Sequence, residues 1–561
     1  MSALVLGPLL RYVDSDSATI WVETSGAAEV VVTAGERRGA ARTFAAHGHH
    51  YALVEVTGLE PGTHTRYEVH VDGELVWPEP GSAYPPSVIP TMKPGKPLRL
   101  AFGSCRVSVP HDAEATEEFG VDALRAYALH MAGEGDTRWP DLVLFLGDQV
   151  YADETTDEVR DFIASRRSLD EPPGEEIKDY EEYAGLYSIA WSDPANRWLL
   201  STLPSAMIFD DHDVRDDWNT SWTWRRQMEA TEWWHDRIVG GLGSYWVYQH
   251  LGNLDRSERA ADPLWQRIAG HDGSDELDLT DELDAFADRA DQHPDSYRWS
   301  YAREFDTQAR LVVVDSRAAR VLEPDRRSII DDAEMSWLDG QLRGDVDHLL
   351  IGTSLPFLMA PGLHHAESFS EALCNGVWGR TVARAGEHLR QAIDLEHWGA
   401  FQQGFQRVAR MVLDVASGGR GEPPRSVTFL SGDVHHSYVA TAGPNGDVTD
   451  LRTTSRIVQA VCSPIRNPLP AAMQRVTTWG TRPRLGRVVR RVARLGKVPP
   501  PPLTWRIDRG PWYDNNLAVL EVQRDGGLAM TWYAGDVEGR DPERPVLRTV
   551  AEVGITAPEA R

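Results

Sequence analysis

Residues 205–219 read SAMIFDDHDVRDDWN, an apolar run that ends directly in a dense group of acidic side chains. A run as apolar as AMIF predicts a buried strand, and the run DDHD (210–213) follows it at once. Buried aspartates so close together repel one another unless a cation neutralises them. The stretch therefore predicts a strand of a buried sheet with a cation site at its carboxyl end.

Three other apolar runs end in the same way. They read AFGSC (101–105), LFLGDQVYAD (144–153) and FLSGDVHHS (429–437), and in each a Gly, Ser or Asp is followed by polar side chains. Open α/β sheets place their sites in the crevice beyond the carboxyl ends of the strands. Pooled, the four junctions offer a thiol, a phenol, imidazoles and several carboxylates. This mixture of donors suits a site for more than one metal ion.

The composition limits the classes of function. At 561 residues the chain is long enough for two or more domains. Its formal net charge of −28 argues against general nucleic-acid binding, and a phosphorylated substrate would need bound cations to approach it. The three scattered cysteines form no disulfide framework. The sequence has no signal-peptide pattern and no apolar window of transmembrane length, so we expect a cytoplasmic protein.

Residues 1–92 have the pattern of an all-β domain. Alternating runs such as TIWVET (19–24) and YALVEV (51–56) are separated by turn residues. The stretch GLEPGTHTRYEVHVDG (58–73) resembles the L-x-P-G-T-x-Y corner of fibronectin type III domains. We therefore expect an N-terminal all-β fibronectin/Ig-like sandwich. The proline-rich segment 83–97 is the predicted linker, because prolines keep a connection extended.

From residue 98 to residue 561 the pattern changes to buried strands that alternate with helical stretches, which predicts a layered α/β domain. The expected strands are the apolar runs at 98–103, 141–147, 205–210, 310–315, 348–353, 426–432, 456–462, 516–522 and 528–535. A Trp-rich insertion (216–250) and an acidic one (255–295) interrupt the pattern. We favour a helical subdomain with an aromatic core for the first, and an aromatic wall over the site is the alternative. The acidic stretch fits a solvated surface.

The segment 473–509 differs from the rest of the chain in charge. It contains ten Lys and Arg against one acidic residue. Within 484–497, residues Leu485, Val488, Val489, Val492 and Leu495 fall on one helical face and the arginines on the other. We favour a helix docked on the acidic body. The alternatives are a cationic lid that guides anionic substrates and a peripheral membrane-surface helix.

The motifs GSC, GDxxY, DDHD and GDVH, in this order and after a β-sandwich, resemble those of the alkaline phosphatase D (PhoD-like) family. That family lies within the calcineurin-like metallophosphatases, and the resemblance covers nearly the whole chain. It implies a four-layered α/β/β/α sandwich and a metal-dependent phosphoric-ester hydrolase, a phosphatase or phosphodiesterase. The resemblance also implies in-line attack on phosphorus by metal-bound hydroxide. The family is known for ferric and calcium ions, so we expect Fe³⁺ and one or two Ca²⁺, with Zn²⁺ and Mn²⁺ as alternatives.

The resemblance also assigns residues. In related purple acid phosphatases a ferric ion is held by an Asp, a bridging Asp, a Tyr and a His. Carried over by motif, the ferric ligands here are Cys105, which replaces an aspartate, Asp148, Tyr151 and His435. The second metal shares Asp148 and takes Asp211 and Asp433, whose oxygens suit calcium.

Further roles rest on the same carry-over. His212 aligns with a histidine that contacts the phosphate or leaving group, and we expect it to protonate the leaving group. Arg106 is the candidate clamp for a phosphate oxygen, with a surface position as its alternative. Asp153, Asp213 and Asn219 are weaker candidates for a further calcium.

The substrate stays open. A small phosphate ester or a phosphodiester is expected, and a phosphodiesterase for lipid or nucleotide substrates is the alternative within enzymes. An alternative from a different class of function is a non-catalytic phosphate-binding or adhesion protein that works through its β-sandwich.

Overall fold

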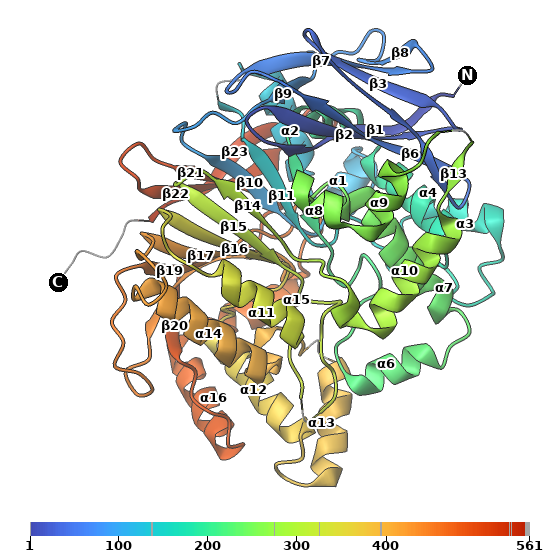
Figure 1. Cartoon of the computed structure of the whole chain (residues 1–561). Coiled ribbons are helices and arrows are strands. Elements are labelled where there is room, and N and C mark those ends of the chain that lie inside the picture. The colour runs from blue at the N-terminus through green and yellow to red at the C-terminus, as the bar shows by residue number, and fades with distance from the viewer. Residues whose placement is uncertain are drawn as a thin grey trace.

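The computed structural model describes residues 2–135, 138–273, 275–324, 326–392, 395–537, 539 and 541–555. Two sheets form the N-terminal part of the chain, at the top of Figure 1. The first, in spatial order, contains β1 (Leu4–Val13), β2 (Ser17–Thr24), β6 (His49–Thr57), β5 (Phe44–Ala46) and β13 (Leu277–Asp278). The second contains β4 (Arg37–Arg42), β3 (Glu29–Ala34), β7 (His64–Val71) and β8 (Glu74–Trp77), and β9 (Val88–Pro90) also pairs with β7. Strands predicted from the alternating runs are confirmed.

The two N-terminal sheets share one apolar core. Ile20, Val32, Val54 and Val69 are fully buried in it and come from strands of both sheets. One detail differs from a fibronectin-type corner, in which the tyrosine hydroxyl binds backbone a few residues upstream. Here the hydroxyl of Tyr67 donates to the carbonyl of Ser201 at 2.7 Å, outside the N-terminal sheets. The fibronectin/Ig-like identity stays a prediction.

Two larger sheets form the rest of the core. One contains, in spatial order, β12 (Ser205–Ile208), β11 (Leu142–Leu146), β10 (Arg99–Gly103), β21 (Leu517–Val522), β22 (Leu528–Asp536) and β23 (Val546–Ile555). The other contains β14 (Tyr301–Phe305), β15 (Ala309–Val314), β16 (His348–Thr353), β17 (Ser426–Ser431), β19 (Arg456–Val461), β18 (Ser437–Pro444) and β20 (Leu503–Trp512). Every strand predicted from 98 onward is present, and the result is a mixed α/β core. The four-layered arrangement stays a prediction.

Parallel pairing fixes the direction of the strands that carry the motifs. In the first large sheet β10, β11 and β12 are parallel, and in the second β15, β16, β17 and β19 are parallel. Each of these runs is buried along its length, as expected of parallel strands covered on both faces. Within each sheet, the carboxyl ends therefore open onto one edge, where polar loops can meet.

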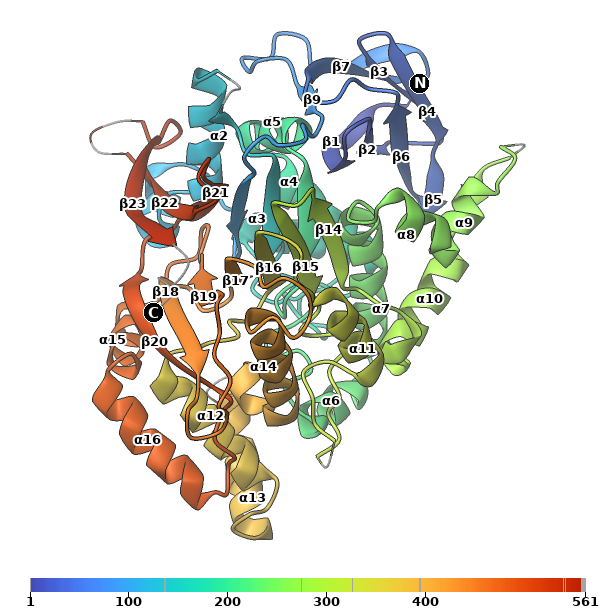
Figure 2. The same cartoon turned by 60° about the vertical axis from the view of Figure 1, so that its left-hand side comes forward.

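Helices surround the two large sheets, as Figures 1 and 2 show. They are α1 (Ala113–Phe119), α2 (Ala123–Gly133), α3 (Asp157–Arg166), α4 (Tyr180–Trp191), α5 (Pro194–Thr202), α6 (Trp222–Glu229), α7 (Trp234–Tyr245), α8 (Arg256–Ala261), α9 (Pro263–Ala269), α10 (Thr280–Gln292), α11 (Asp332–Gln341), α12 (Pro361–Cys374), α13 (Arg380–Ala392), α14 (Gln402–Ala416), α15 (Ala471–Gly480) and α16 (Pro483–Leu495). Among the described residues no helix is both long and apolar enough to cross a membrane.

The Trp-rich insertion forms α6, α7 and the segment after them. Trp218, Trp224, Trp234 and Trp246 are buried, whereas Trp222 is exposed. Most of these large aromatic side chains therefore fill a core, as the favoured interpretation of the insertion predicts. The acidic insertion also contributes β13, which extends the N-terminal sheet by pairing with β5. This pairing ties the insertion to the N-terminal part of the chain.

Candidate metal centre

Backbone hydrogen bonds lock the loops after β10, β11 and β17 together. The N–H of Cys105 donates to the carbonyl of Gly147 at 3.3 Å, and the N–H of Arg106 donates to that of Asp148 at 3.1 Å. From the third loop, the N–H of Asp433 donates to Oγ of Ser104 at 3.1 Å. The loop after β12 joins them, because the carboxylate of Asp213 accepts the N–H of Asp148 at 2.9 Å. The four junctions predicted from sequence thus meet at one place.

Four of the predicted ligands have an unusual backbone conformation. The φ angles are 58° at Cys105, 48° at Asp148, 66° at Asp433 and 49° at His435. L-residues rarely adopt positive φ, and each such residue costs on the order of 1–3 kcal/mol when the surrounding structure enforces it. The interlocked loops hold these residues in place. Strain gathered on four side chains of one cluster is typical of a functional site.

Three side chains form the first group of donors. The ligand atoms of Cys105, Asp148 and His435 all lie within 4.8 Å of one another. Burial raises the pKa of the Cys105 thiol well above its usual value, and the Asp148 and Asp433 carboxylates raise it further. Burial lowers the pKa of His435 to about 4, so its imidazole is neutral and can act as a ligand. Thiol, carboxylate and neutral imidazole form a plausible transition-metal set.

Tyr151 completes this group. Its hydroxyl accepts a hydrogen bond from Nδ2 of Asn467 at 3.0 Å. Burial raises the pKa of the phenol well above 10, and the neighbouring Cys105 and Asp148 act in the same direction. The phenol and the thiol therefore keep their protons unless a cation compensates the charge. A bound metal ion inverts this, because coordination deprotonates such ligands.

Asp148 lies at the centre of the cluster. Its Oδ2 accepts the Cys105 thiol at 3.3 Å, whereas its Oδ1 is buried without a hydrogen-bond partner among the described residues. Burial raises its pKa well above the usual range despite the His212 ring, and the aspartates of the 210–213 loop raise it as well. A buried acceptor without a donor is costly, and a cation would satisfy it. This oxygen is direct evidence that the donor set fits a metal.

Two of the three donors predicted for a second metal, Asp211 and Asp433, lie together with Asp210, which was not predicted as a ligand. Asp210, Asp211 and Asp433 have oxygens within 4.8 Å of one another. The guanidinium of Arg317, fully buried, lies against all three, with Nη2 3.0 Å from Oδ1 of Asp211 and 3.6 Å from Oδ1 of Asp433. Glu396 also contacts Arg317, but it is paired with Arg320. All three side chains offer oxygen donors, and Asp211 and Asp433 share the single guanidinium of Arg317, so the set suits a hard divalent cation.

Sequence reasoning missed Arg317, although a signal for it was present. It follows Asp315 and Ser316 at the end of β15, a strand that the apolar run 310–315 predicted. Polar side chains that follow a parallel strand are expected to line the site, and this rule would have selected Arg317.

His397 was missed as well, without any comparable signal. It lies in the loop after α13 and follows no strand. Its Nε2 is 3.0 Å from Oδ2 of Asp433, and its Nδ1 is 2.7 Å from Oε1 of Glu367. Burial would lower the pKa of His397, but Glu367 and Asp433 raise it well above 6.5. The protonated ring therefore orients Asp433.

His212 lies beside the first donor group. Its ring lies beside that of Tyr151, tilted by 33° with centroids 4.8 Å apart, and its Nδ1 is 2.9 Å from Oδ1 of Asp153. Burial would lower the pKa of the imidazole, but the Asp153 carboxylate raises it well above 6.5. His212 is thus held as a proton donor. Asp153, a weak candidate for a further calcium, instead pairs with His212.

Arg106 requires a correction. It is buried, not on the surface, and its Nη2 is 2.9 Å from Oδ2 of Asp122, while its Nη1 donates to the carbonyl of Ala190 at 2.9 Å. Asp122 also caps α2 through the N–H groups of Leu124 and Arg125. The guanidinium therefore fastens α2 and α4 behind the site. The surface position is therefore wrong, and the phosphate clamp stays a prediction.

Asp213 and Asn219 also have structural partners. Oδ2 of Asp213 accepts the N–H groups of Asp148 and Asp210 at 2.9 Å each. Nδ2 of Asn219 donates to the carbonyl of Arg317 at 3.2 Å. Both side chains shape the loops around the cluster.

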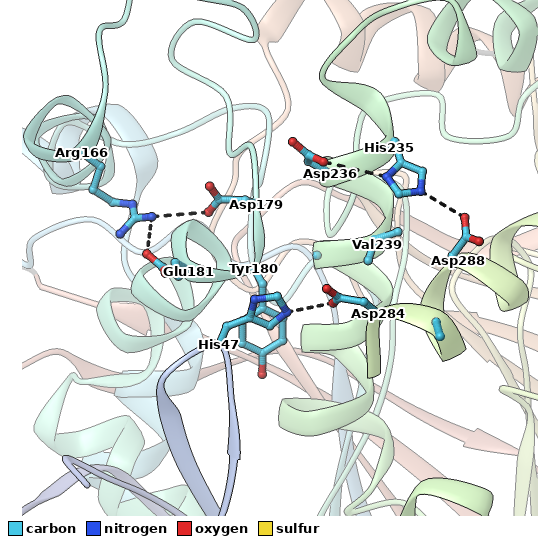
Figure 3. Close-up of a pocket in the computed structure, with 12 residues that line it drawn as sticks. His47, Arg166, Asp179, Tyr180, Glu181, His235, Asp236, Val239, Asp284 and Asp288 are labelled. Carbon is cyan, nitrogen blue, oxygen red and sulfur yellow. Dashed lines mark hydrogen bonds and ion pairs between the residues drawn. The ribbon is translucent and has the colours of Figure 1, made fainter. Parts of the chain in front are cut away.

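A cavity of about 430 Å³ lies away from this cluster, between the N-terminal sheets and helices α4, α7 and α10 (Figure 3). Most of its charged side chains are paired with one another. His47 is 2.8 Å from Asp284, His235 is 3.2 Å from Asp288, and Arg166 pairs with Glu181. None of the predicted ligands lines it. The metal cluster, not this cavity, is the candidate active site.

Comparisons with known proteins identify the family of the chain. A family model described as PhoD-like phosphatase matches residues 115–484, and a domain of unknown function (DUF7800) matches residues 1–89. The chain is similar to a solved structure of PhoD with a TM-score of 0.58 and 16% identity, over 99% of this chain and 90% of that one. It also matches purple acid phosphatase PPD1 from yellow lupin (Lupinus luteus), with a TM-score of 0.47, 9% identity and coverage of 98% and 74%. No curated protein matches it.

Proposed function

The chain belongs to the PhoD-like phosphatase family and is a phosphatase-type hydrolase, and we propose that it cleaves phosphoric esters at the cluster around Asp148. The observation that carries this proposal is the buried, hydrogen-bond-free Oδ1 of Asp148 between two groups of potential ligands. A carboxylate in this position can bridge two cations, which is the arrangement that phosphoryl transfer uses.

For the metals, we propose that Cys105, Asp148, Tyr151 and His435 hold a ferric ion and that Asp148, Asp211 and Asp433 hold calcium. Thiolate and phenolate donors together with carboxylate favour a trivalent iron, whereas an all-oxygen set favours a hard divalent ion. Charge also supports two ions, because the two groups together carry more negative charge than Arg317 neutralises. When bound, such ions lower the pKa of a coordinated water and stabilise charge on the phosphoryl oxygens.

The chain's own residues supply the remaining steps. His212, held by Asp153 and by the ring of Tyr151, donates a proton to the oxygen of the leaving group. The His397 ring fixes the orientation of the Asp433 carboxylate from the side opposite Arg317. Cys105, Asp148 and Asp211 are buried and Asp433, His435 and His212 are half-buried, which strengthens these electrostatic interactions.

The test pairs metal analysis with turnover of p-nitrophenyl phosphate and of its bis-ester. Turnover of the monoester alone identifies a phosphomonoesterase, and preference for the bis-ester identifies a phosphodiesterase. Metal-loaded protein that turns over neither compound, and that binds inorganic phosphate, would instead support the non-catalytic alternative. Asp148→Ala is the control, because it should lose turnover of both esters together with the metals.

A further inference from the structure

Helices α15 and α16 carry apolar side chains that face away from the protein. Trp479 and Val476 on α15 are 57% and 56% exposed, and Val488 and Leu495 on α16 are 55% and 67% exposed. Met473 and Val492 are exposed beside them. In Figure 2 the two helices lie at the outer edge of the molecule, next to α12. We call these six residues the α15–α16 apolar face.

The side of α16 that faces away from the α15–α16 apolar face packs against α12. A Cβ added at Gly486 would lie 3.3 Å from Pro361, one at Gly496 would lie 2.8 Å from Phe369, and Ala493 is buried. Small residues thus let α16 pack closely on α12. Most of the apolar stripe expected to dock this helix does not do so, because Val488, Val492 and Leu495 are exposed, whereas Val489 is half-buried. The side chain of Leu485 lies outside the described residues.

The exposed apolar stripe is flanked by cations. Arg487, Arg491, Arg494 and Lys497 are exposed, and the chain has no Asp or Glu from 473 to 497. Within the described part of the chain, the ion pair of this helix joins Arg490 to Asp447 at 4.0 Å, which is weak. A helix with an apolar stripe and a basic border suits the boundary between lipid head groups and acyl chains.

A cavity behind α16 provides an independent observation. It measures about 270 Å³ and lies between α12, α16 and β20. Arg487, Arg490 and Arg506 line it together with His365 and Trp505. Burial, together with the charges of Arg490 and Arg494, lowers the pKa of His365 to about 4. Arg506 is paired with Asp508 at 2.6 Å, so Arg487 and Arg490 supply the guanidinium groups that match an anionic phosphate head group at this cavity.

We propose that the α15–α16 apolar face binds the surface of an anionic lipid bilayer, with its apolar side chains among the acyl chains and its arginines on the head groups. Charge favours this partner over a second copy of the chain. A symmetric pair would bring two sets of arginines together without an acidic residue between them. A bilayer with anionic lipids instead supplies the opposite charge along the whole face.

This surface is connected to the metal centre. Oγ1 of Thr478 on α15 is 2.6 Å from the hydroxyl of Tyr513, whose ring centroid is 6.0 Å from that of His436, the neighbour of His435. Protein bound through α15 and α16 would therefore present this side of the molecule to the lipid. The binding itself depends on no catalytic step and holds whether or not the proposed function is correct.

The experiment is sedimentation of the full-length protein with vesicles. We expect binding to vesicles in which a third of the lipid is phosphatidylglycerol, no binding to phosphatidylcholine alone, and release by salt. Arg491→Gln should weaken binding by roughly five-fold, and a double variant with Arg494→Gln by roughly 25-fold. Val492→Asp combined with Leu495→Asp should abolish it. Val5→Asp, at an exposed apolar position in β1, is the matched control and should bind normally.

Turnover and metal content of each variant should equal those of the wild type, which shows that the variants fold. Two results would overturn the proposal. One is that the wild type does not sediment with phosphatidylglycerol vesicles, or that the Val492→Asp/Leu495→Asp variant sediments with them as well as the wild type does. The other is a wild type that forms dimers in light scattering and does not bind vesicles, together with a Val492→Asp/Leu495→Asp variant that is monomeric. A second copy of the chain would then occupy the surface.

Discussion

Replacing His212 with alanine tests the assignment of the proton donor. The ring is buried, lies 2.9 Å from the Asp153 carboxylate and sits beside Tyr151. A positioned general acid contributes about 10²- to 10⁴-fold to the rate, which is roughly 3–5 kcal/mol of barrier. We expect this loss on phenyl phosphate, whose leaving group needs a proton. The loss on p-nitrophenyl phosphate should be much smaller, because that leaving group departs as an anion.

Asp153→Asn tests the same assignment with a milder change, because it removes the charge that holds His212 and leaves the imidazole in place. A hydrogen bond to a charged group contributes about 1.5–3 kcal/mol, so the variant should lose roughly 10- to 100-fold on phenyl phosphate. The Asp153 carboxylate raises the pKa of His212, and removing its charge lets the imidazolium lose its proton at a lower pH. The fall in rate on the alkaline side of the pH profile should therefore begin at lower pH than in the wild type.

The assay is steady-state turnover of both esters across pH, with metal content measured in each preparation. Equal losses on the two esters would refute the general-acid role and assign His212 to binding of the phosphate. Loss of metal in His212→Ala would make it a ligand instead, since its ring nitrogen lies within 4.8 Å of oxygens of Asp148 and Asp211.

Further predictions concern the rest of the cluster. Asp148→Ala should lose at least one metal and all turnover, because uncompensated cations close together repel strongly at low dielectric; wild-type metal content would remove the bridging assignment. Tyr151→Phe should keep the fold by circular dichroism and weaken or shift any visible absorption band, since it removes one electron-rich donor; an unchanged band would exclude the phenol as a ligand. Arg317→Met should lower the stability of metal-free protein by about 3–5 kcal/mol in urea unfolding, because buried carboxylates lose their partner, and a stability equal to wild type would contradict the ion-pair account.

Local patterns predicted the strands and the motif loops well. Buried parallel strands are continuous apolar runs, so runs such as 141–147 and 426–432 stand out from their surroundings. The polar residues that follow them sit at fixed positions relative to the strand ends. For this reason Cys105, Asp148, Asp211, Asp433 and His435 could be selected from sequence and do lie together.

Contacts between distant loops could not be predicted in the same way. Whether Arg106 faces a substrate or a helix depends on Asp122, and nothing local to residue 106 reveals that partner. His397 reaches Asp433 from a loop between helices, which no strand-end rule covers. The amphipathic pattern of α16 was correct, but the pattern alone does not say which side packs. Gly486 and Ala493 decide this, because close approach to α12 requires small residues.

We propose above that iron bound at Cys105 and Tyr151 acts in phosphoryl hydrolysis together with a divalent ion at Asp211 and Asp433. The most direct measurement is metal analysis of purified protein in parallel with visible absorption and turnover of p-nitrophenyl phosphate. We predict iron and calcium in comparable amounts, a thiolate- and phenolate-to-iron charge-transfer band in proportion to the iron, and parallel loss of band and activity on reduction with dithionite. Colourless, iron-free protein with full activity in zinc or calcium alone would contradict the ferric assignment.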